Sequence, residues 1–228
     1  MVIQRFLLAV CLSWANLLFA QPVSAPPTVA VWDFENHTVS ALTTLTQLDF
    51  LRRSLSEVIL ASLLGATGIK VVDRLHLQEV LTEQKLGSSD LADTDTRIRL
   101  GRIMGAQRMI FGSFTAIGDQ VQVSLRAVDS ATSLIIFADQ YTCGIDQVLN
   151  QAQEATRRLS RALGSSLLKP VKDHPTPLWA EYDKALALSD AGRYAEAIEA
   201  LKNILIKDKD FVIAERQLTA VLERLARQ

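Results

Sequence analysis

The sequence predicts an α/β (α+β) protein in which a mixed β-sheet is flanked by helices and followed by a small C-terminal helical hairpin domain. Strand-like and helix-like segments succeed one another in the order β-α-β-α-α-β-β-β-α up to about residue 163, which indicates helices packed on a sheet. The six prolines form two clusters, at 22–27 and 170–177, and proline interrupts helices and central strands. We therefore expect a body over 28–165, a proline-rich linker over 166–177 and a helical domain over 178–228.

The first half of the body is predicted to alternate strands and helices. Residues 28–34 are rich in β-formers and apolar on both faces, as in a buried strand. A helix is expected over 43–64, because apolar residues recur there at spacings of three and four. Its apolar face consists of Leu48, Leu51, Leu55, Val58, Ile59 and Ser62. A short strand over 69–72 follows, and Asp73 is the expected N-cap of the next helix.

A third helix is predicted over 95–104. Its apolar face would consist of Ile98, Leu100, Ile103 and Met104. Gly101 and Gly105 lie at the end of this helix, where we interpret them as a close helix–strand contact and a C-cap.

The second half of the body is predicted to be a three-stranded meander closed by a helix over 145–163. The expected strands are 108–116, 120–129 and 133–142. In the middle strand, apolar and polar residues alternate in the order Val121, Gln122, Val123, Ser124, Leu125 and Arg126. One face of the meander is therefore expected to be packed and the other to be in contact with water.

Composition excludes several classes of protein. Hydrophobic residues make up 49% of the chain and charged residues 21%, which is ordinary for a globular protein and excludes a disordered or collagen-like chain. The 24 basic residues are balanced by 25 acidic ones, so net charge gives no reason to expect nucleic acid as a partner. Two cysteines and three histidines are too few for a zinc finger or a disulfide scaffold.

The first 20 residues are predicted to be a secretory signal peptide, and 21–27 a linker. An apolar run of fifteen residues extends from Phe6 to Ala20. This is shorter than the roughly 20 residues of a spanning helix and suits the hydrophobic region of a signal peptide. We expect export to the periplasm, with peripheral association with the outer membrane as an option and no spanning segment in the mature chain.

The site of cleavage leaves alternatives open. Ala20 and Ala25 both offer a small residue, and Pro26 disfavours cleavage after Ala25, so Ala20 is preferred. A retained N-terminal anchor and lipidation of Cys11 are the alternatives, although Val10 is large for the position before a lipidated cysteine.

Acidic residues at the end of the first predicted strand are the main candidates for chemistry. Asp33 and Glu35 lie two residues apart, with His37 close by, at a position where open α/β sheets often bind ligands. A metal-dependent enzyme is the alternative that they raise. No further ligand follows at metal-site spacing, and no nucleophile–base arrangement is visible. We expect a protein without catalytic, cofactor-binding or metal-binding residues.

An ordered series of short motifs runs through the body. It comprises Val29–Asn36, Val71–Arg74, Leu77, Val80–Gln84, Leu100-Gly101, Gly105-Ala106, Ile110–Ser113, Val128-Asp129 and Ala131-Thr132. The series resembles the curli production assembly/transport (CsgG) family over about 28–163. The resemblance implies a non-enzymatic envelope protein that acts as a scaffold or accessory in outer-membrane assembly or secretion, with envelope proteins as partners and no cofactor.

Two further functions are compatible with this series of motifs and remain open. One is a regulatory binding module similar to the N-terminal domain of TolB or to a peptidoglycan-synthase activator. The other is a subunit of a secretion pore, which would be a homo-oligomer. The polar face of 120–126 is unsuited to lipid, which disfavours the pore.

The C-terminal piece resembles one tetratricopeptide repeat (TPR) over about 178–211. Its small and apolar signature residues are Ala185, Gly192, Tyr194, Ala197, Ile198 and Leu201, and Lys209 replaces the usual proline. A third helix is expected over 211–226. About three repeats are needed for a solenoid, so the piece should dock on the body, on a partner or on another copy. The candidate protein-contact residues are Trp179, Tyr182, Tyr194, Leu218 and Leu222, of which Trp179 and Tyr182 are also interpreted as helix-packing residues.

Overall fold

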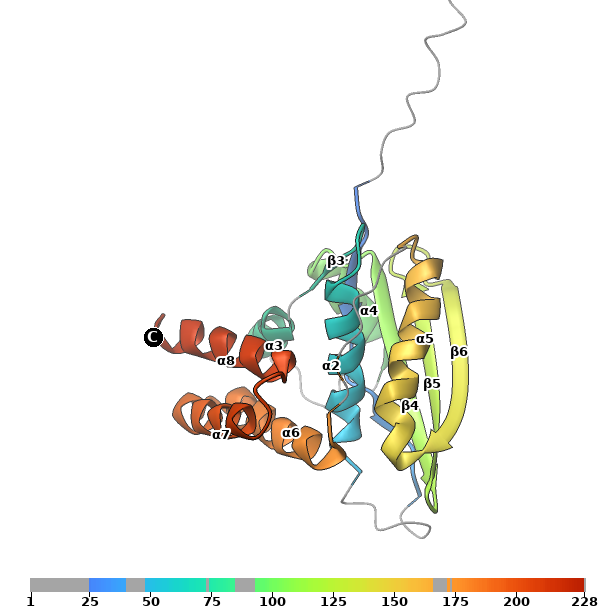
Figure 1. Ribbon diagram of the computed structural model, residues 1–228. Coiled ribbons are helices and arrows are strands. Elements are labelled where there is room, and N and C mark those ends of the chain that lie inside the picture. Colours follow the sequence, from blue (N-terminus) through green and yellow to red (C-terminus); the bar gives the residue numbers. More distant parts are fainter. Residues whose placement is uncertain are drawn as a thin grey trace, which may run out of the picture.

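The computed structural model describes residues 25–39, 48–72, 74–84, 93–165, 172 and 174–227. It is a mixed sheet with helices on both faces, to which three C-terminal helices add a further layer (Figure 1). The predicted signal peptide, most of the linker after it and the Asp73 N-cap lie outside the described residues. In the part of the chain that the structure describes, no helix has both the length and the apolar composition needed to cross a membrane.

The order of the elements agrees with the prediction for the body. The strands are β1 (Thr28–Val31), β2 (Glu35–Asn36), β3 (Lys70–Val71), β4 (Arg108–Ile117), β5 (Gln120–Asp129) and β6 (Ile135–Gly144). The helices are α2 (Leu51–Leu64), α3 (Arg74–Glu83), α4 (Thr94–Ile103), α5 (Val148–Ala162), α6 (Thr176–Asp190), α7 (Tyr194–Lys207) and α8 (Val212–Leu225). A short 3-10 turn, η4 (Ile145–Gln147), leads into α5.

The sheet combines parallel and antiparallel pairing, as the sequence predicted. Its strand order is β3-β1-β4-β5-β6, and β2 also pairs with β4. Strand β1 lies between β3 and β4 and runs parallel to both, whereas β4, β5 and β6 form an antiparallel meander. The predicted alternation in β5 is confirmed, because Val121, Val123 and Leu125 are buried.

The first predicted strand is shorter than expected. It was predicted over 28–34, but β1 ends at Val31 and the chain pairs again only at Glu35. Phe34 interrupts the ladder, since its amide donates to the carbonyl oxygen of Arg52. Its ring occupies the space beside Gly112, where an added Cβ would lie 2.0 Å from the ring. The ring of Phe34 therefore fills the space that a side chain at position 112 would need.

The helix predicted over 43–64 begins later than expected, at Leu51. Residues 40–47 lie outside the described residues, and a turn over 48–50 precedes the helix. All six residues of its predicted apolar face are buried. Ser56 and Glu57, which the sequence placed on another face, are buried too. The reason is that α2 lies between the sheet and the C-terminal helices (Figure 1).

Two hydrophobic clusters lie on the two faces of the sheet. The larger one joins the strands to α2 and α5, and the smaller one joins β1 and β4 to α3 and α4. Gly101 of α4 packs against Met109, whose sulfur would lie 2.2 Å from an added Cβ, and Gly105 has φ +70°. Both glycine interpretations are confirmed. Ile103 is 56% exposed, contrary to the prediction, because α4 ends there and the chain turns away at Gly105.

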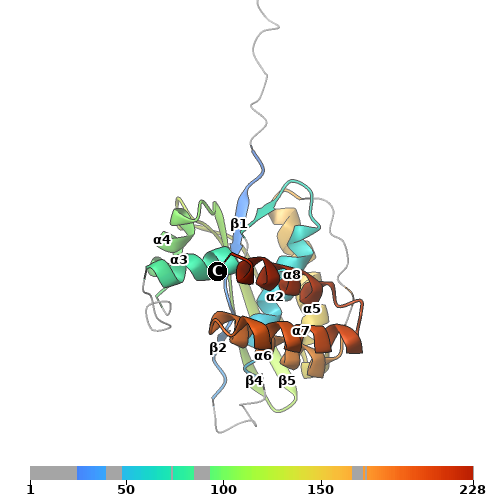
Figure 2. The same cartoon turned by 90° about the vertical axis from the view of Figure 1, so that its left-hand side faces the viewer.

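The C-terminal helices dock on the body. Figure 2 shows α6, α7 and α8 lying across α2, and their apolar residues belong to the same cluster as those of α2 and α5. Ala185 and Ala197 are fully buried where α6 and α7 cross, and Gly192 turns the chain with φ +74°. Arg53 of α2 donates to Asp183 of α6 over 3.0 Å. Of the three docking alternatives, this structure shows docking on the body.

Candidate functional site

The three residues that raised a metal-dependent enzyme are separated into two ion-pair sites. The side chain of Glu35 contacts Nε2 of His37 over 3.0 Å and a guanidinium nitrogen of Arg97 over 2.5 Å. Asp33 instead accepts a hydrogen bond from Ser56 and lies 3.8 Å from Arg53. Among the described residues, no three His, Cys, Asp or Glu side chains gather as they would around a metal ion.

Glu35 is held as a paired carboxylate. Partial burial acts to raise the pKa of Glu35, but the hydrogen bond and charge of Arg97, with a smaller contribution from His37, hold it below its ordinary value. A carboxylate with a lowered pKa is a weak base. The geometry therefore fits an electrostatic and structural role for this residue.

A groove of about 460 Å³ lies on the polar face of the meander. Its polar lining consists of Glu35, His37, Ser113, Ser124, Arg126, Gln140 and Asp139, the last of which is paired with Arg158. The strand register explains the set, because Ser113 pairs with Glu35 on one side and Ser124 on the other, and Ser124 pairs with Gln140. Directly paired residues point to the same face of a sheet. The water-exposed face predicted from the alternation in β5 is therefore a continuous polar floor.

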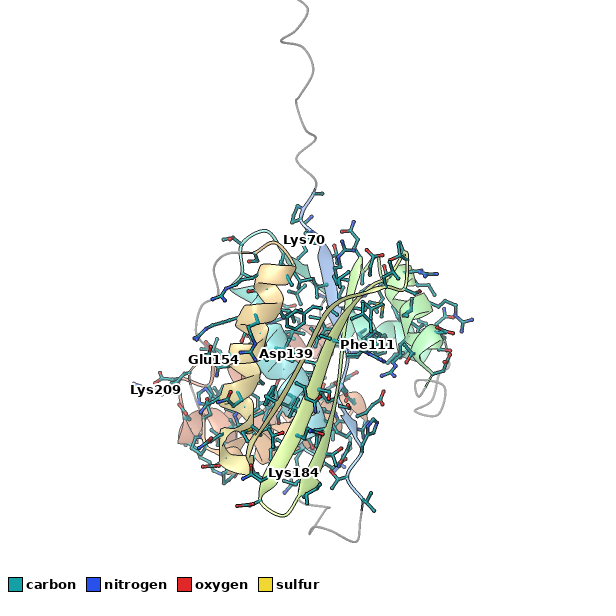
Figure 3. The ribbon with its side chains drawn as sticks, turned by 90° about the vertical axis from the view of Figure 1, so that its right-hand side faces the viewer. Lys70, Phe111, Asp139, Glu154, Lys184 and Lys209 are labelled. Atoms are coloured by element: carbon teal, nitrogen blue, oxygen red, sulfur yellow. The ribbon has the colours of Figure 1, made fainter. Side chains whose placement is uncertain are left out.

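One wall of the groove is built around Phe111, which lies between the strands and α4 (Figure 3). The guanidinium carbon of Arg97 lies 5.0 Å from the centre of its ring, and that of Arg126 lies 5.5 Å from it. These distances are typical of cation–π contacts. The Arg97 side chain is 5% exposed, whereas Arg126 is exposed and also lines the groove. Arg126 is thus positioned to meet an anionic group of a ligand or partner.

Sequence reasoning placed Arg126 on the wet face but missed its role and that of Arg97. The only signal for Arg126 was a cation on the polar side of an alternating strand. Nothing in the sequence joins Arg97 to Glu35, because the two residues are brought together by the packing of α4 beside β2.

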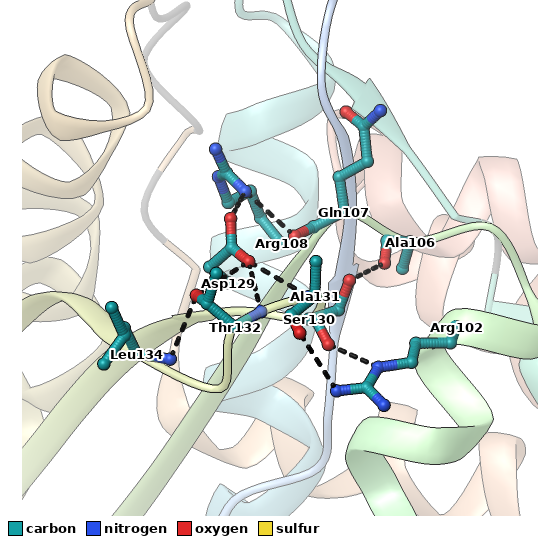
Figure 4. Close-up of polar contacts among 9 residues, drawn as sticks. All are labelled: Arg102, Ala106, Gln107, Arg108, Asp129, Ser130, Ala131, Thr132 and Leu134. Carbon is teal, nitrogen blue, oxygen red and sulfur yellow. Dashed lines mark hydrogen bonds and ion pairs between the residues drawn. The ribbon is translucent and has the colours of Figure 1, made fainter.

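The motif residues around the β5–β6 turn form a hydrogen-bonded framework (Figure 4). Asp129 accepts hydrogen bonds from the amides of Ala131 and Thr132, at 3.0 and 2.9 Å, and forms an ion pair with Arg108. Ser130 donates to the carbonyl oxygen of Ala106 over 2.7 Å. These bonds join the turn to the loop that leads into β4.

The hydrogen bonds around Asp129 have an electrostatic consequence. The amide of Thr132 contributes most to holding the pKa of Asp129 below its ordinary value, against a smaller opposing effect of burial, and Arg108 assists. These residues of the motif series therefore stabilise the fold.

The predicted protein-contact residues divide by burial. Trp179, Tyr182 and Tyr194 are buried at 2%, 1% and 9% exposure, Leu218 is partly buried, and Leu222 is 46% exposed. The helix-packing interpretation of Trp179 and Tyr182 is confirmed, since both rings contact the buried ring of Phe211. Of the five residues, Leu222 is therefore the most accessible.

His174 has a role that the sequence did not reveal. It lies in the predicted linker, yet it is buried, stacks on Phe211 at 4.2 Å between ring centres and contacts Asp208 over 2.7 Å. This contact fixes the entry into α6 against the α7–α8 turn. Its partners are 34 and 37 residues away along the chain, so no local pattern could have indicated it.

Comparison with known proteins identifies the family of the N-terminal half. Residues 15–122 match the family described as "Curli production assembly/transport component CsgG". The match begins before the predicted body and ends within β5. No curated protein matches the chain.

Several solved structures are similar to parts of the chain. The LpoB C-terminal domain from Salmonella enterica is 20% identical, with 55% of this chain and 87% of that chain covered and a TM-score of 0.38. Lipoprotein GNA1162 from Neisseria meningitidis is 14% identical, with coverages of 60% and 99% and a TM-score of 0.44. The PelC dodecamer from Paraburkholderia phytofirmans is 11% identical, with coverages of 63% and 90% and a TM-score of 0.36.

The family match and the element order agree with the resemblance read from the motif series. The chain carries a CsgG-family domain, matched over residues 15–122.

Proposed function

We propose that this chain is a secreted, non-enzymatic protein of the cell envelope that acts as a scaffold or accessory in outer-membrane assembly or secretion. It works through protein–protein contacts in the periplasm. The observation that carries the proposal is the CsgG-family domain matched over residues 15–122. Beyond that match, the motif residues at the β5–β6 turn hold the fold through hydrogen bonds.

Two surfaces support a role in binding proteins. The first is the groove, which offers a polar floor and the exposed cation of Arg126. The second is the outer side of α8, where Leu222 and Leu225 are 46% and 42% exposed and Val212, at the start of the helix, is 65% exposed. Exposed apolar residues that gather on one element are typical of interaction surfaces. We assign the C-terminal contact function to Leu222 and its apolar neighbours.

The proposal includes a processed chain with two modules. Residues 1–20 are removed as a signal peptide, and the segment 166–177 joins the CsgG-like module to a single TPR-like module over 178–228. The buried small residues at the α6–α7 crossing and the glycine turn support the TPR-like interpretation. Because the C-terminal helices share a core with α2, the two modules act as one unit.

A second candidate is a regulatory binding module similar to those of TolB or of peptidoglycan-synthase activators. The observation that favours it is the docking of the C-terminal helices on α2. Their apolar residues are buried within one chain, so this packing needs no second copy. Such a module would be a monomer, whereas a channel-like assembly would form a ring. Light scattering on the processed chain, with and without detergent, separates the two.

Site-specific photo-crosslinking tests the proposed function. A photoreactive amino acid is placed at Leu222, at Gln140 in the groove, or at Lys202 as an exposed control on α7. We expect a protein of the envelope fraction to be crosslinked in cells from Leu222 or Gln140 and not from Lys202. A chain that stays in the cytoplasm with residues 1–20 attached, or that yields no adduct from either surface, would contradict the proposal.

A further inference from the structure

The end of the sheet at which β1 begins, here called the Thr28 end, carries a one-sided set of charges. Lys70 pairs in register with Thr28, and Gln107, next to Arg108, donates its amide to the carbonyl oxygen of Thr28. Arg108 in turn pairs with Asp129. The turn after Asp129 is held by Arg102, which donates to the carbonyl oxygen of Ser130.

A fourth cation joins this end from the other layer. Figure 1 shows the last turn of α5 at the same end as the start of β1, and Arg161 lies in that turn. The described residues placed here by register, hydrogen bonds and the view include four cations, Lys70, Arg102, Arg108 and Arg161, and one carboxylate, that of Asp129, which pairs with Arg108. Arg102 is bonded to neutral carbonyl oxygens, so its charge is uncompensated.

Exposed apolar side chains lie among these cations. Ile103, at the end of α4, is 56% exposed, and Leu134 and Ile135, after the β5–β6 turn, are 65% and 58% exposed. The amide of Asp129 donates to the carbonyl oxygen of Leu134, which holds these residues beside the turn. Large apolar side chains next to cations are the composition of a surface that inserts at the lipid headgroup boundary.

We propose that the Thr28 end is a docking surface for an anionic phospholipid bilayer. The cations attract the headgroups, and Ile103, Leu134 and Ile135 insert between them. The proposal rests on the proposed function only for the compartment in which the chain meets a membrane. It goes beyond that function, because it assigns a membrane contact to another part of the sheet. Of the three inserting residues Ile135 alone also lines the groove, and the polar floor of the groove and α8 remain free for protein partners.

The composition of the Thr28 end supports the bilayer as the occupant. Lys70, Arg102 and Arg161 are exposed cations that match anionic headgroups, and the exposed apolar side chains beside them match the boundary between headgroups and acyl chains. Figure 3 shows Lys70 beside the start of β1, far from Lys184.

Vesicle co-sedimentation tests the proposal. The chain from residue 21 onward contains every described residue, and it is mixed with phosphatidylcholine vesicles with or without 30% phosphatidylglycerol. We expect binding only to the anionic vesicles, and a fall in binding as salt is added. The variant Lys70→Ala/Arg161→Ala should bind about 25-fold more weakly, because each cation near an anionic surface contributes about a factor of five.

Matched variants separate insertion and general charge from folding. Ile103→Ser/Leu134→Ser, at two residues that do not line the groove, should weaken binding about tenfold at unchanged charge. The control Lys184→Ala/Lys209→Ala removes the same charge elsewhere, on exposed residues, and should leave binding unchanged, as should Ile206→Ser on an 81% exposed residue. Circular dichroism confirms that each variant is folded.

Three outcomes would overturn the assignment. The first is an absence of binding to anionic vesicles, and the second is an equal loss in the control variants. The third is a dimer in light scattering that Ile103→Ser/Leu134→Ser abolishes, since the surface would then bind a second copy. None of these readouts involves the crosslinking sites at Leu222 and Gln140, so failure here leaves the proposed function separately testable.

Discussion

The two faces of the meander differ in what their residues are used for. On the covered face, Gly112 and Leu125 pack with Phe34 beneath α2 and α5. On the groove face, Ser113, Ser124 and Gln140 form a polar floor whose atoms remain available. Adjacent residues of one strand therefore alternate between the packed core and the polar floor of the groove. Many residues of the motif series that resembles the CsgG family lie on the covered face or in the turn framework. We therefore expect the residues that select the partners of this chain to lie on the groove face.

The largest expected effect is on the covered face. In Gly112→Leu the new side chain would overlap the ring of Phe34, since even a Cβ would lie 2.0 Å from it. We expect the free energy of unfolding to fall by about 3 kcal/mol, measured by urea denaturation. The matched change Ser113→Ala, on the groove face of the same strand, should alter it by less than about 0.5 kcal/mol. Equal effects of the two variants would remove the distinction between the faces.

The wall of the groove lies between these extremes. Arg97→Ala removes the ion pair with Glu35 and the contact with Phe111. Loss of a fully buried pair would cost more, but Glu35 is 39% exposed, so we expect about 2 kcal/mol of destabilisation. Arg97→Lys should recover part of this, because it restores the charge but not the planar contact with the ring. Thermal unfolding of the three proteins side by side provides the measurement, and a fully stable Arg97→Ala would contradict the assigned role.

The turn framework gives a pH-dependent prediction. Asp129→Ala should cost about 1.5 kcal/mol at neutral pH, because two turn amides lose their acceptor. The pKa of Asp129 is lowered in the folded protein, so its stabilising contribution is complete above its unfolded pKa of about 3.9. That contribution is lost as the pH falls through the lower folded value. The gap in stability between the wild-type protein and Asp129→Ala should therefore close below about pH 4.

Urea denaturation at pH 7 and pH 3 measures this gap. Asp119→Ala, in the β4–β5 turn, is the control, since it removes an exposed carboxylate of the same meander. A gap between wild type and Asp129→Ala that is constant with pH would show that the carboxylate charge has no part in holding the turn.

Local patterns in the sequence were sufficient for much of this fold. Alternation in β5 defined its two faces, Gly101 indicated a close helix–strand contact and Gly105 indicated the end of a helix, and the structure shows both. Contacts between distant segments were not predictable in this way. The end of β1 at Val31 depends on where Phe34 finds space, and burial of Glu57 depends on helices more than 100 residues away.

The groove also shows that local patterns do not predict contacts between distant segments. Its polar floor was predictable, because the alternation of polar and apolar residues in a strand indicates which side chains lie on each face. The Arg97–Glu35 pair and the arginines on Phe111 arise from the docking of α4 on the sheet. No spacing in the sequence encodes that docking, and for this reason the wall of the site was missed while its floor was anticipated.

The smallest effect on stability is expected at Arg126, and it separates recognition from folding most sharply. Arg126→Ala removes an exposed cation whose contact with Phe111 is 5.5 Å, so we expect a cost of about 0.5 kcal/mol. If the groove binds an acidic partner, crosslinking from Gln140 should fall severalfold in this variant, whereas crosslinking from Leu222 should be unchanged. Arg99→Ala, which removes an exposed cation from α4, is the matched control. A variant that lowers both adducts equally would show that Arg126 acts through the fold, and one that lowers neither would move the partner-binding surface away from the groove and onto α8.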